Sequence, residues 1–222
     1  MSITELFSRG GIAMWPLLFL SVLAFGSIVD RIWFWSRILT REREVSGRVL
    51  EAARREWSAA ADIAKRSNKL PMGRFLEAAL SIEKPEPEVF RLALETAANE
   101  ELAIMRRGEK VLEAVIAIAP LLGLLGTVVG LINSLGSIQL SDLGSDATAG
   151  TALGIGEALI STAVGLVIAI TSLAFYRLFQ GFVFGQAKVF RQSGSELELL
   201  YRQAWSKKRV EPTPALATEG ES

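Results

Sequence analysis

The 222-residue chain contains no cysteine and no histidine. Without cysteine it cannot form disulfides, use a catalytic thiol or hold an iron–sulfur cluster, and the usual zinc sites need one of the two missing residue types. Serine–histidine and cysteine–histidine catalysis are excluded for the same reason. Only enzymes that use carboxylates alone remain possible, and Glu157, the one acid within the third apolar run, has no second acid at a workable depth. We therefore expect no metal site, no cofactor and no catalytic residues.

An excess of either sign of charge is also missing, since 24 Lys+Arg balance 24 Asp+Glu. A nucleic-acid-binding protein would carry a basic excess, so no nucleic-acid partner is expected. Half of the residues are hydrophobic, which is high for a soluble domain of this length. The many charges must then be separated from the apolar runs, as in a membrane protein with sizeable water-exposed parts.

Three runs are long and apolar enough to cross a bilayer, which takes roughly 20 residues each. They predict transmembrane helices at 11–30, 112–138 and 149–176, and Glu157 is the only charged residue in the last run. Lys and Arg gather after the first span, before the second and after the third, whereas residues 139–150 contain none. By the positive-inside rule the N-terminus lies outside and the C-terminus in the cytoplasm. A cleavable signal peptide is the competing interpretation of the first span, but the basic charge is on the wrong flank.

The remaining segments predict an all-α protein whose spans extend into a cytoplasmic helical bundle. We expect an interfacial segment at 1–10, a cytoplasmic helical region at 31–111, a periplasmic loop at 139–148, a cytoplasmic helix at 177–206 and a disordered tail at 207–222. Within the cytoplasmic region the pattern predicts helices over 42–69 and about 71–83, separated by Pro71. Residues 88–138 read as one long helix, and the third span should continue to about Trp205.

Small residues recur at helical spacing in the second and third spans. The first stripe consists of Gly123, Thr127, Gly130 and Ser134, and the second of Gly154, Ala158, Thr162, Gly165 and Ala169. Such stripes let helix backbones approach closely in lipid. They can be packing faces alone, with each threonine bonded to its own helix, or Thr127 and Thr162 can offer hydroxyls to a partner group or to water.

Glu157 favours the functional alternative, because a carboxylate in a span is costly unless it is paired, protonated or near water. The alternative is that Glu157 has no functional role and lies at the membrane interface, near the outer end of the helix. No Lys, Arg or second acid occurs near mid-depth in any span. The chain alone therefore offers no complete charged relay, and either it conducts nothing or another subunit supplies the titrating group.

Two motifs resemble the signatures of the MotA/TolQ/ExbB proton-channel family. They are IAPLLGLLGTVVG at 118–130 in the second span and GEALISTAVGL at 156–166 in the third. The order of spans and the large cytoplasmic insertion also fit, so the resemblance covers residues 11 to about 200. Three spans rather than four disfavour a flagellar MotA-type stator, and the first-span exit, DRIWFW at 30–35, is more similar to ExbB than to TolQ.

The resemblance implies a homopentameric ring in the bacterial inner membrane whose second and third helices line a pore. A single-span ExbD/TolR-like subunit inside the ring would carry the aspartate that binds the proton, with Thr127 and Thr162 opposite it and Glu157 as the acidic pore residue. A TonB-like protein would then deliver work to outer-membrane transport. A TolQ-type subunit of the Tol-Pal system and a non-conducting scaffold remain alternatives. The family's proline after the third-span motif is absent here, where Thr171 stands.

Overall fold

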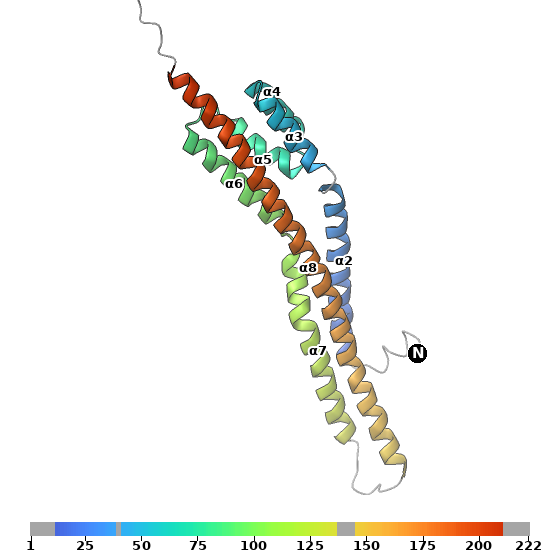
Figure 1. Ribbon diagram of the computed structural model, residues 1–222. Coiled ribbons are helices and arrows are strands. Elements are labelled where there is room, and N and C mark those ends of the chain that lie inside the picture. The colour runs from blue at the N-terminus through green and yellow to red at the C-terminus, as the bar shows by residue number, and fades with distance from the viewer. Residues whose placement is uncertain (1–11, 39–40, 137–144, 211–222) are drawn as a thin grey trace, which may run out of the picture. The chain divides into compact units, whose positions relative to one another are not determined.

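The computed structural model describes residues 12–38, 41–136 and 145–210, and all regular structure within these ranges is α-helical (Figure 1). The helices are α2 (Met14–Ile38), α3 (Glu42–Ala53), α4 (Trp57–Arg66), α5 (Pro71–Leu80), α6 (Pro87–Met105), α7 (Glu109–Gly136) and α8 (Ser145–Val210). The predicted all-α fold class is confirmed. The interfacial segment expected at 1–10, most of the loop at 139–148 and the end of the tail lie outside the described residues.

The chain forms two compact units, and α8 contributes to both. The first unit contains α2, α7 and α8 up to Phe182, and the second contains α3 to α6 and α8 from Val183 onward. Within the described ranges, α2, α7 and α8 are long and apolar enough to cross a membrane. The prediction of three spans is therefore confirmed.

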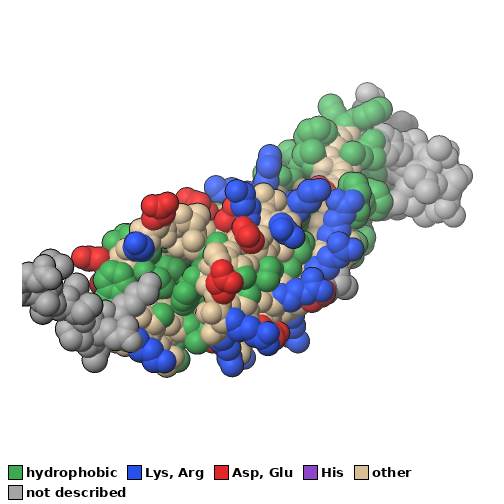
Figure 2. All heavy atoms as spheres, turned by 90° about the horizontal axis from the view of Figure 1, so that it is seen from above, with side chains coloured by type: hydrophobic (Ala, Val, Ile, Leu, Met, Phe, Trp, Pro, Cys, Tyr) green, Lys and Arg blue, Asp and Glu red, His purple; other side chains and the backbone are tan. Residues whose placement is uncertain are grey.

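The helices of the first unit carry large apolar side chains on their outer faces. Phe25 in α2 is 69% exposed, Leu121 in α7 is 64% exposed and Ile170 in α8 is 65% exposed. A helix in water would present polar residues there, so these faces suit lipid or neighbouring subunits. Charged side chains instead cover much of the second unit, as Figure 2 shows.

The second unit has an aromatic core between the short helices and α8. Phe75 of α5 stacks on Phe190 of α8 with ring centroids 4.9 Å apart, and both side chains are buried. A side chain at Gly194 would place its Cβ 3.0 Å from the Phe75 ring. The small residue therefore allows α5 to approach α8 closely.

The single helix expected over 42–69 is wrong, because α3 ends at Ala53 and α4 begins at Trp57. Glu56 between them is extended, with φ −151° and ψ 123°. No proline or glycine marks this break, so helix propensity alone allows the helix to continue. Contacts of α3 with both α4 and α5 show that packing turns the chain back on itself.

The single helix expected over 88–138 is also wrong, because the chain breaks between Met105 and Glu109. Gly108 has a φ of +89°, a left-handed conformation that side chains other than glycine adopt at a cost. Basic residues followed by glycine are a usual helix C-terminus, and Arg106-Arg107-Gly108 is that signal. The second span therefore begins as a separate helix.

The third span continues into the second unit as one helix, in agreement with the prediction that it passes Tyr176. Its end differs from the expected one, since α8 reaches Val210 rather than stopping near 206. The helix expected at about 71–83 ends at Leu80. The tail predicted from Lys207 onward rests on Pro212, Pro214 and Gly220, which all follow residue 210. They therefore leave residues 207–210 able to continue the long preceding helix.

A group of charged residues in the second unit includes two buried carboxylates, Glu42 and Glu101, and the partly exposed Arg74. Arg74 of α5 donates two hydrogen bonds to the Glu101 carboxylate of α6, at 2.5 Å each. Glu42, in the first turn of α3, is 2% exposed, and no described donor reaches hydrogen-bonding geometry with either of its oxygens. Burial raises the Glu42 pKa from 4.5 to about 7, against the opposite effects of the Met72 backbone amide and Arg74.

Candidate functional site

A close helix contact in the first unit joins the glycine stripe of α7 to the small residues of α8. A Cβ placed on Gly123 would lie 2.9 Å from the Ser161 carbonyl oxygen and 2.9 Å from Thr162 Cα. A Cβ on Gly130 would lie 2.8 Å from Ala158 Cβ. Real Cβ atoms essentially never come this near, so the two backbones touch only because these positions have no side chain.

Gly165 completes the same contact from the side of α8. Its Cβ would lie 2.5 Å from the Ala119 carbonyl oxygen and 3.3 Å from Gly123 Cα. The pairs run in opposite directions along the two helices, with Gly165 near Ala119 and Ala158 near Gly130. The helices are therefore antiparallel, and their backbones rather than their side chains form the seam.

Ser161 bridges the two helices by a hydrogen bond. Its hydroxyl, which is fully buried, lies 3.1 Å from the Gly123 carbonyl oxygen and 2.9 Å from the Ala158 carbonyl oxygen. The Gly123 contact links α8 to α7, so it adds a polar connection to the glycine seam. Such interhelical bonds contribute about 0.6 kcal/mol on average in membranes.

The two threonines of the candidate pathway differ in their hydrogen bonding. The Thr127 hydroxyl donates to the Leu124 carbonyl of its own helix at 2.7 Å, and the residue is 8% exposed. The Thr162 hydroxyl is buried and has no hydrogen-bond partner among the described residues. An unpaired buried hydroxyl is costly, so Thr162 is the one of the two with an unused donor and acceptor.

The helix register separates the two hydroxyl-bearing residues along the seam. Thr162 lies level with Gly123, and Thr127 follows Gly123 by four residues, an axial offset of about 6 Å. No described contact joins Thr127 to Thr162. The pair therefore places two hydroxyls at successive depths of the membrane unit rather than at one point.

The other site residues predicted from the sequence occupy three kinds of position. Gly123, Gly130, Ala158 and Gly165 form the seam itself. Ser134 lies near the end of α7 and is not without an interaction partner. Gly154 and Glu157 lie in α8, outside the residues whose side chains the structure describes; Glu157 directly precedes the seam residue Ala158.

Sequence reasoning missed two residues of the seam, Ser161 and Gly126. A Cβ on Gly126 would meet the Ser161 hydroxyl and would lie 2.8 Å from Ala13 Cβ, just before α2. A stripe of period 3.6 can run through either 126 or 127, so spacing alone does not select Gly126. Likewise Ser161 is three residues after Ala158 and four before Gly165, so spacing fits it as well as Thr162.

The seam can support packing and proton handling but no bond-making chemistry. Its polar atoms are hydroxyls and backbone carbonyls, which can pass a proton or hold water but are not activated nucleophiles. Among the described residues, no group of three or more potential ligands gathers to hold a metal ion. The fold and the seam thus define a polytopic α-helical membrane protein with a glycine-packed pair of spans, in which the Thr162 hydroxyl is buried without a partner among the described residues.

The chain belongs to the MotA/TolQ/ExbB proton channel family, whose model matches residues 67–192. That range includes the second and third spans and the seam between them. Among curated relatives, the "Putative biopolymer transport protein ExbB-like 1" of Synechocystis is 48% identical over 200 residues, which are 90% of this chain and 79% of the relative. The resemblance inferred from the two motifs is confirmed.

Two further relatives show how the similarity is distributed. The "ExbB-like 3" protein of Synechocystis is 38% identical over 194 residues, covering 87% of this chain and 92% of that protein. The "Biopolymer transport protein ExbB" of Salmonella typhimurium is 43% identical over only 75 residues, or 34% of this chain and 30% of its own length. Similarity along most of the chain is therefore found with the ExbB-like proteins.

Proposed function

We propose that this protein is the multi-span subunit of a proton-driven motor in the bacterial inner membrane. The observation that carries the proposal is the Thr162 hydroxyl, buried in the seam without a described partner in a chain of a proton channel family. A hydroxyl in that state can accept or donate a hydrogen bond to a group that arrives from another subunit. Moving one charge through 100 mV yields about 2.3 kcal/mol, enough to bias a conformational step.

The titrating group comes from a partner, because the spans contain no second acid and no base near mid-depth. An ExbD/TolR-like subunit with one span and a membrane aspartate would supply it, inside a homopentameric ring of this chain. Thr162 and Thr127 would face that aspartate at successive depths, and Glu157 would connect the site with the outer side. In this arrangement the N-terminus is periplasmic and the C-terminus cytoplasmic.

The motor would deliver work through a TonB-like protein to outer-membrane transport. The names of the curated relatives support this assignment over a Tol-Pal role, because those relatives are named ExbB or ExbB-like. A non-conducting scaffold has two observations in its favour. The glycine stripes are used within the chain, and Thr127 is bonded to its own helix.

Proton flux through reconstituted protein tests the proposal. The subunit is incorporated into liposomes with its single-span partner, and acidification is followed with a trapped pH-sensitive dye under an imposed potential. Thr162→Val removes the unpaired hydroxyl at nearly constant volume, and we expect at least a tenfold loss of flux. Ser161→Ala is the matched control, because that neighbouring hydroxyl is already bonded within the chain, and its flux should stay near wild type.

Two results would contradict the proposal. Equal flux in wild type and Thr162→Val would remove the hydroxyl from the pathway. No partner-dependent flux in the wild type, with the complex intact on size-exclusion chromatography, would favour the scaffold.

A further inference from the structure

Basic residues from α2 and from the start of α7 lie at one depth of the first unit. A Cβ on Gly108 would lie 3.6 Å from Arg31 Nε. Gly126 follows Gly108 by eighteen residues, and its Cβ would lie 2.8 Å from Ala13, which precedes Arg31 by eighteen residues. Therefore α2 runs antiparallel to α7, and Arg31 lies level with the break before α7.

The third span brings another cation to this depth. In the seam Gly165 lies against Ala119. Lys110 precedes Ala119 by nine residues, about 14 Å along α7, and Arg177 follows Gly165 by twelve residues, about 18 Å along α8. Because the two helices are antiparallel, Lys110 and Arg177 lie toward the same end of the unit, within about one helical turn of each other in depth.

Positive charge is in excess at this depth. Segments 27–35, 105–114 and 172–182 contain five basic and three acidic residues, namely Arg31, Arg106, Arg107, Lys110 and Arg177 against Asp30, Glu109 and Glu113. The buried Arg31 pairs with Asp30 at 2.8 Å, and Arg106 acts electrostatically on Glu109. Two of the three acids are therefore engaged by Arg31 and Arg106.

The other three cations keep their charge exposed. Arg107, Lys110 and Arg177 are all exposed, and none of them forms an ion pair with Glu113 or with another acid of the described ranges. Arg177 only contacts the side-chain oxygen of Gln180, at 3.4 Å. We name Arg107, Lys110 and Arg177 the basic collar.

An exposed apolar helix face begins next to the collar on both α7 and α8. On α7, Lys110 is followed at spacings of three or four by the exposed residues Ala114, Ile118, Leu121, Leu125 and Val128. On α8, Arg177 is preceded at the same spacings by the exposed residues Leu173, Ile170, Leu166, Ala163 and Leu159. A cation at the head of an apolar face matches a phospholipid, whose charged headgroup stands above hydrocarbon chains.

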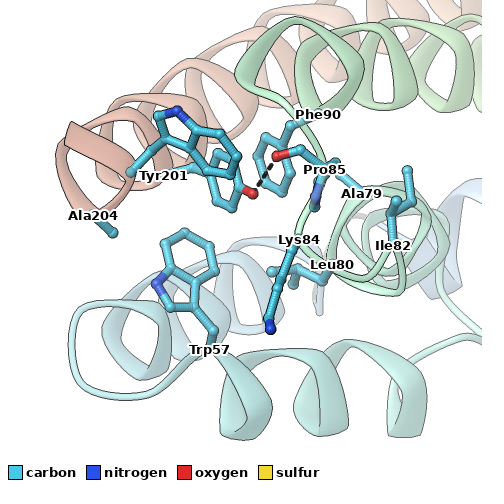
Figure 3. A pocket seen from close by; sticks show the side chains of 10 residues that line it. Trp57, Ala79, Leu80, Ile82, Lys84, Pro85, Phe90, Tyr201 and Ala204 are labelled. Carbon is cyan, nitrogen blue, oxygen red and sulfur yellow. Dashed lines mark hydrogen bonds between the residues drawn. The ribbon is translucent and has the colours of Figure 1, made fainter. Parts of the chain in front are cut away.

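Exposed tryptophans place the collar at the depth of the headgroups. Trp33, two residues after Arg31, is 62% exposed, and Trp15, about 27 Å earlier along α2, is 67% exposed. This separation is close to one hydrocarbon thickness, and tryptophans are enriched at both membrane interfaces. In the second unit Trp57 is instead used within the fold, where it meets the Tyr201 ring edge-on at 5.3 Å (Figure 3).

We infer that the basic collar binds the headgroups of anionic phospholipids, with their acyl chains along the exposed faces of α7 and α8. The excess of positive charge selects this class, because a zwitterionic headgroup carries a cation of its own that the collar repels. Each basic residue near an anionic surface strengthens binding about fivefold. The inference is independent of the proposed proton pathway, since no collar residue belongs to the seam.

The association of spin-labelled lipids tests the collar in the full-length protein. The chain is reconstituted in phosphatidylcholine vesicles with a trace of phosphatidylglycerol or phosphatidylcholine that carries a spin label on one acyl chain. Electron spin resonance separates the lipid immobilised at the protein surface from the bulk lipid, which gives the association of phosphatidylglycerol relative to phosphatidylcholine. The collar variant is Arg107→Gln with Lys110→Gln and Arg177→Gln.

The matched control removes three exposed basic residues of the second unit. Lys65→Gln, Arg66→Gln and Lys69→Gln, in and just after α4, change the net charge by the same amount. At low salt we expect wild type and control to prefer phosphatidylglycerol at least threefold, and the collar variant to show a ratio near one. In 1 M salt the wild-type preference should also fall toward one, because the screening length is then about 3 Å.

Three results would overturn the inference. One is a wild type without preference at low salt, as expected if further copies of this chain cover the collar. The second is a collar variant that keeps the preference, and the third is an equal loss in the control, which would assign the effect to net charge. The salt dependence of the wild type tests the charge attraction even where a variant does not fold.

Discussion

Substitution of Gly165 by alanine examines the seam most directly. The new Cβ would lie 2.5 Å from the Ala119 carbonyl oxygen, whereas ordinary contacts begin near 3.4 Å. The two helices must then separate by roughly 0.9 Å, a displacement worked out from these two distances. Overpacking of this kind costs about 1–3 kcal/mol.

Helix propensity acts in the opposite direction, and a second glycine of α8 measures it. Replacing glycine by alanine within a helix stabilises by about 1 kcal/mol. Gly181 lies in the same helix and the same unit, is exposed, and would place its Cβ in open space. Gly181→Ala is therefore the matched control, and the difference between the two variants isolates the contact with α7.

We expect Gly165→Ala to be less stable than Gly181→Ala by about 1–3 kcal/mol. For a chain of this size 1 kcal/mol shifts the unfolding midpoint by about 2–4 °C, so the variants should differ by about 2–12 °C. The assay is the thermal midpoint of detergent-purified protein, measured as the fraction still soluble after heating. Indistinguishable midpoints for the two variants would refute a backbone-to-backbone seam.

Two further predictions concern the break before the second span and the buried acid of the second unit. Gly108→Ala should destabilise by about 1–2 kcal/mol, because alanine must adopt a left-handed φ, while Gly47→Ala, whose Cβ meets nothing within 4 Å, should not; equal thermal midpoints would contradict this. For Glu42, the carboxyl is protonated in both states below about pH 4.5, and between there and about pH 7 only the unfolded chain ionises freely. The free energy of unfolding should therefore fall by roughly 3 kcal/mol as pH rises through that window. Glu42→Gln should remove this part of the pH dependence of the midpoint, and a variant that keeps the wild-type slope would contradict the assigned burial.

Several features were predictable because they depend on short-range pattern. The span count follows from run length, and the family follows from two motifs at 118–130 and 156–166. The position of Gly123, Gly130 and Gly165 on helix faces follows from spacing alone. The helix breaks before Trp57 and at Gly108 were harder to predict. No proline or glycine marks the first break. Basic residues followed by glycine mark the second, but the long apolar run that comes after them favours one continuous helix.

The amino-acid sequence by itself determined that this protein is α-helical, that it has three apolar spans, and that small residues line two of them. These properties depend on amino-acid composition and on the spacing of residues along one helix, both of which can be read within a short stretch of sequence. Only the tertiary structure decided that the small residues bring α7 and α8 backbone to backbone, that the Ser161 hydroxyl bridges the helices and that the Thr162 hydroxyl is left without a described partner. Hydrogen bonding between segments far apart in the chain depends on helix register and rotation, which no local pattern encodes.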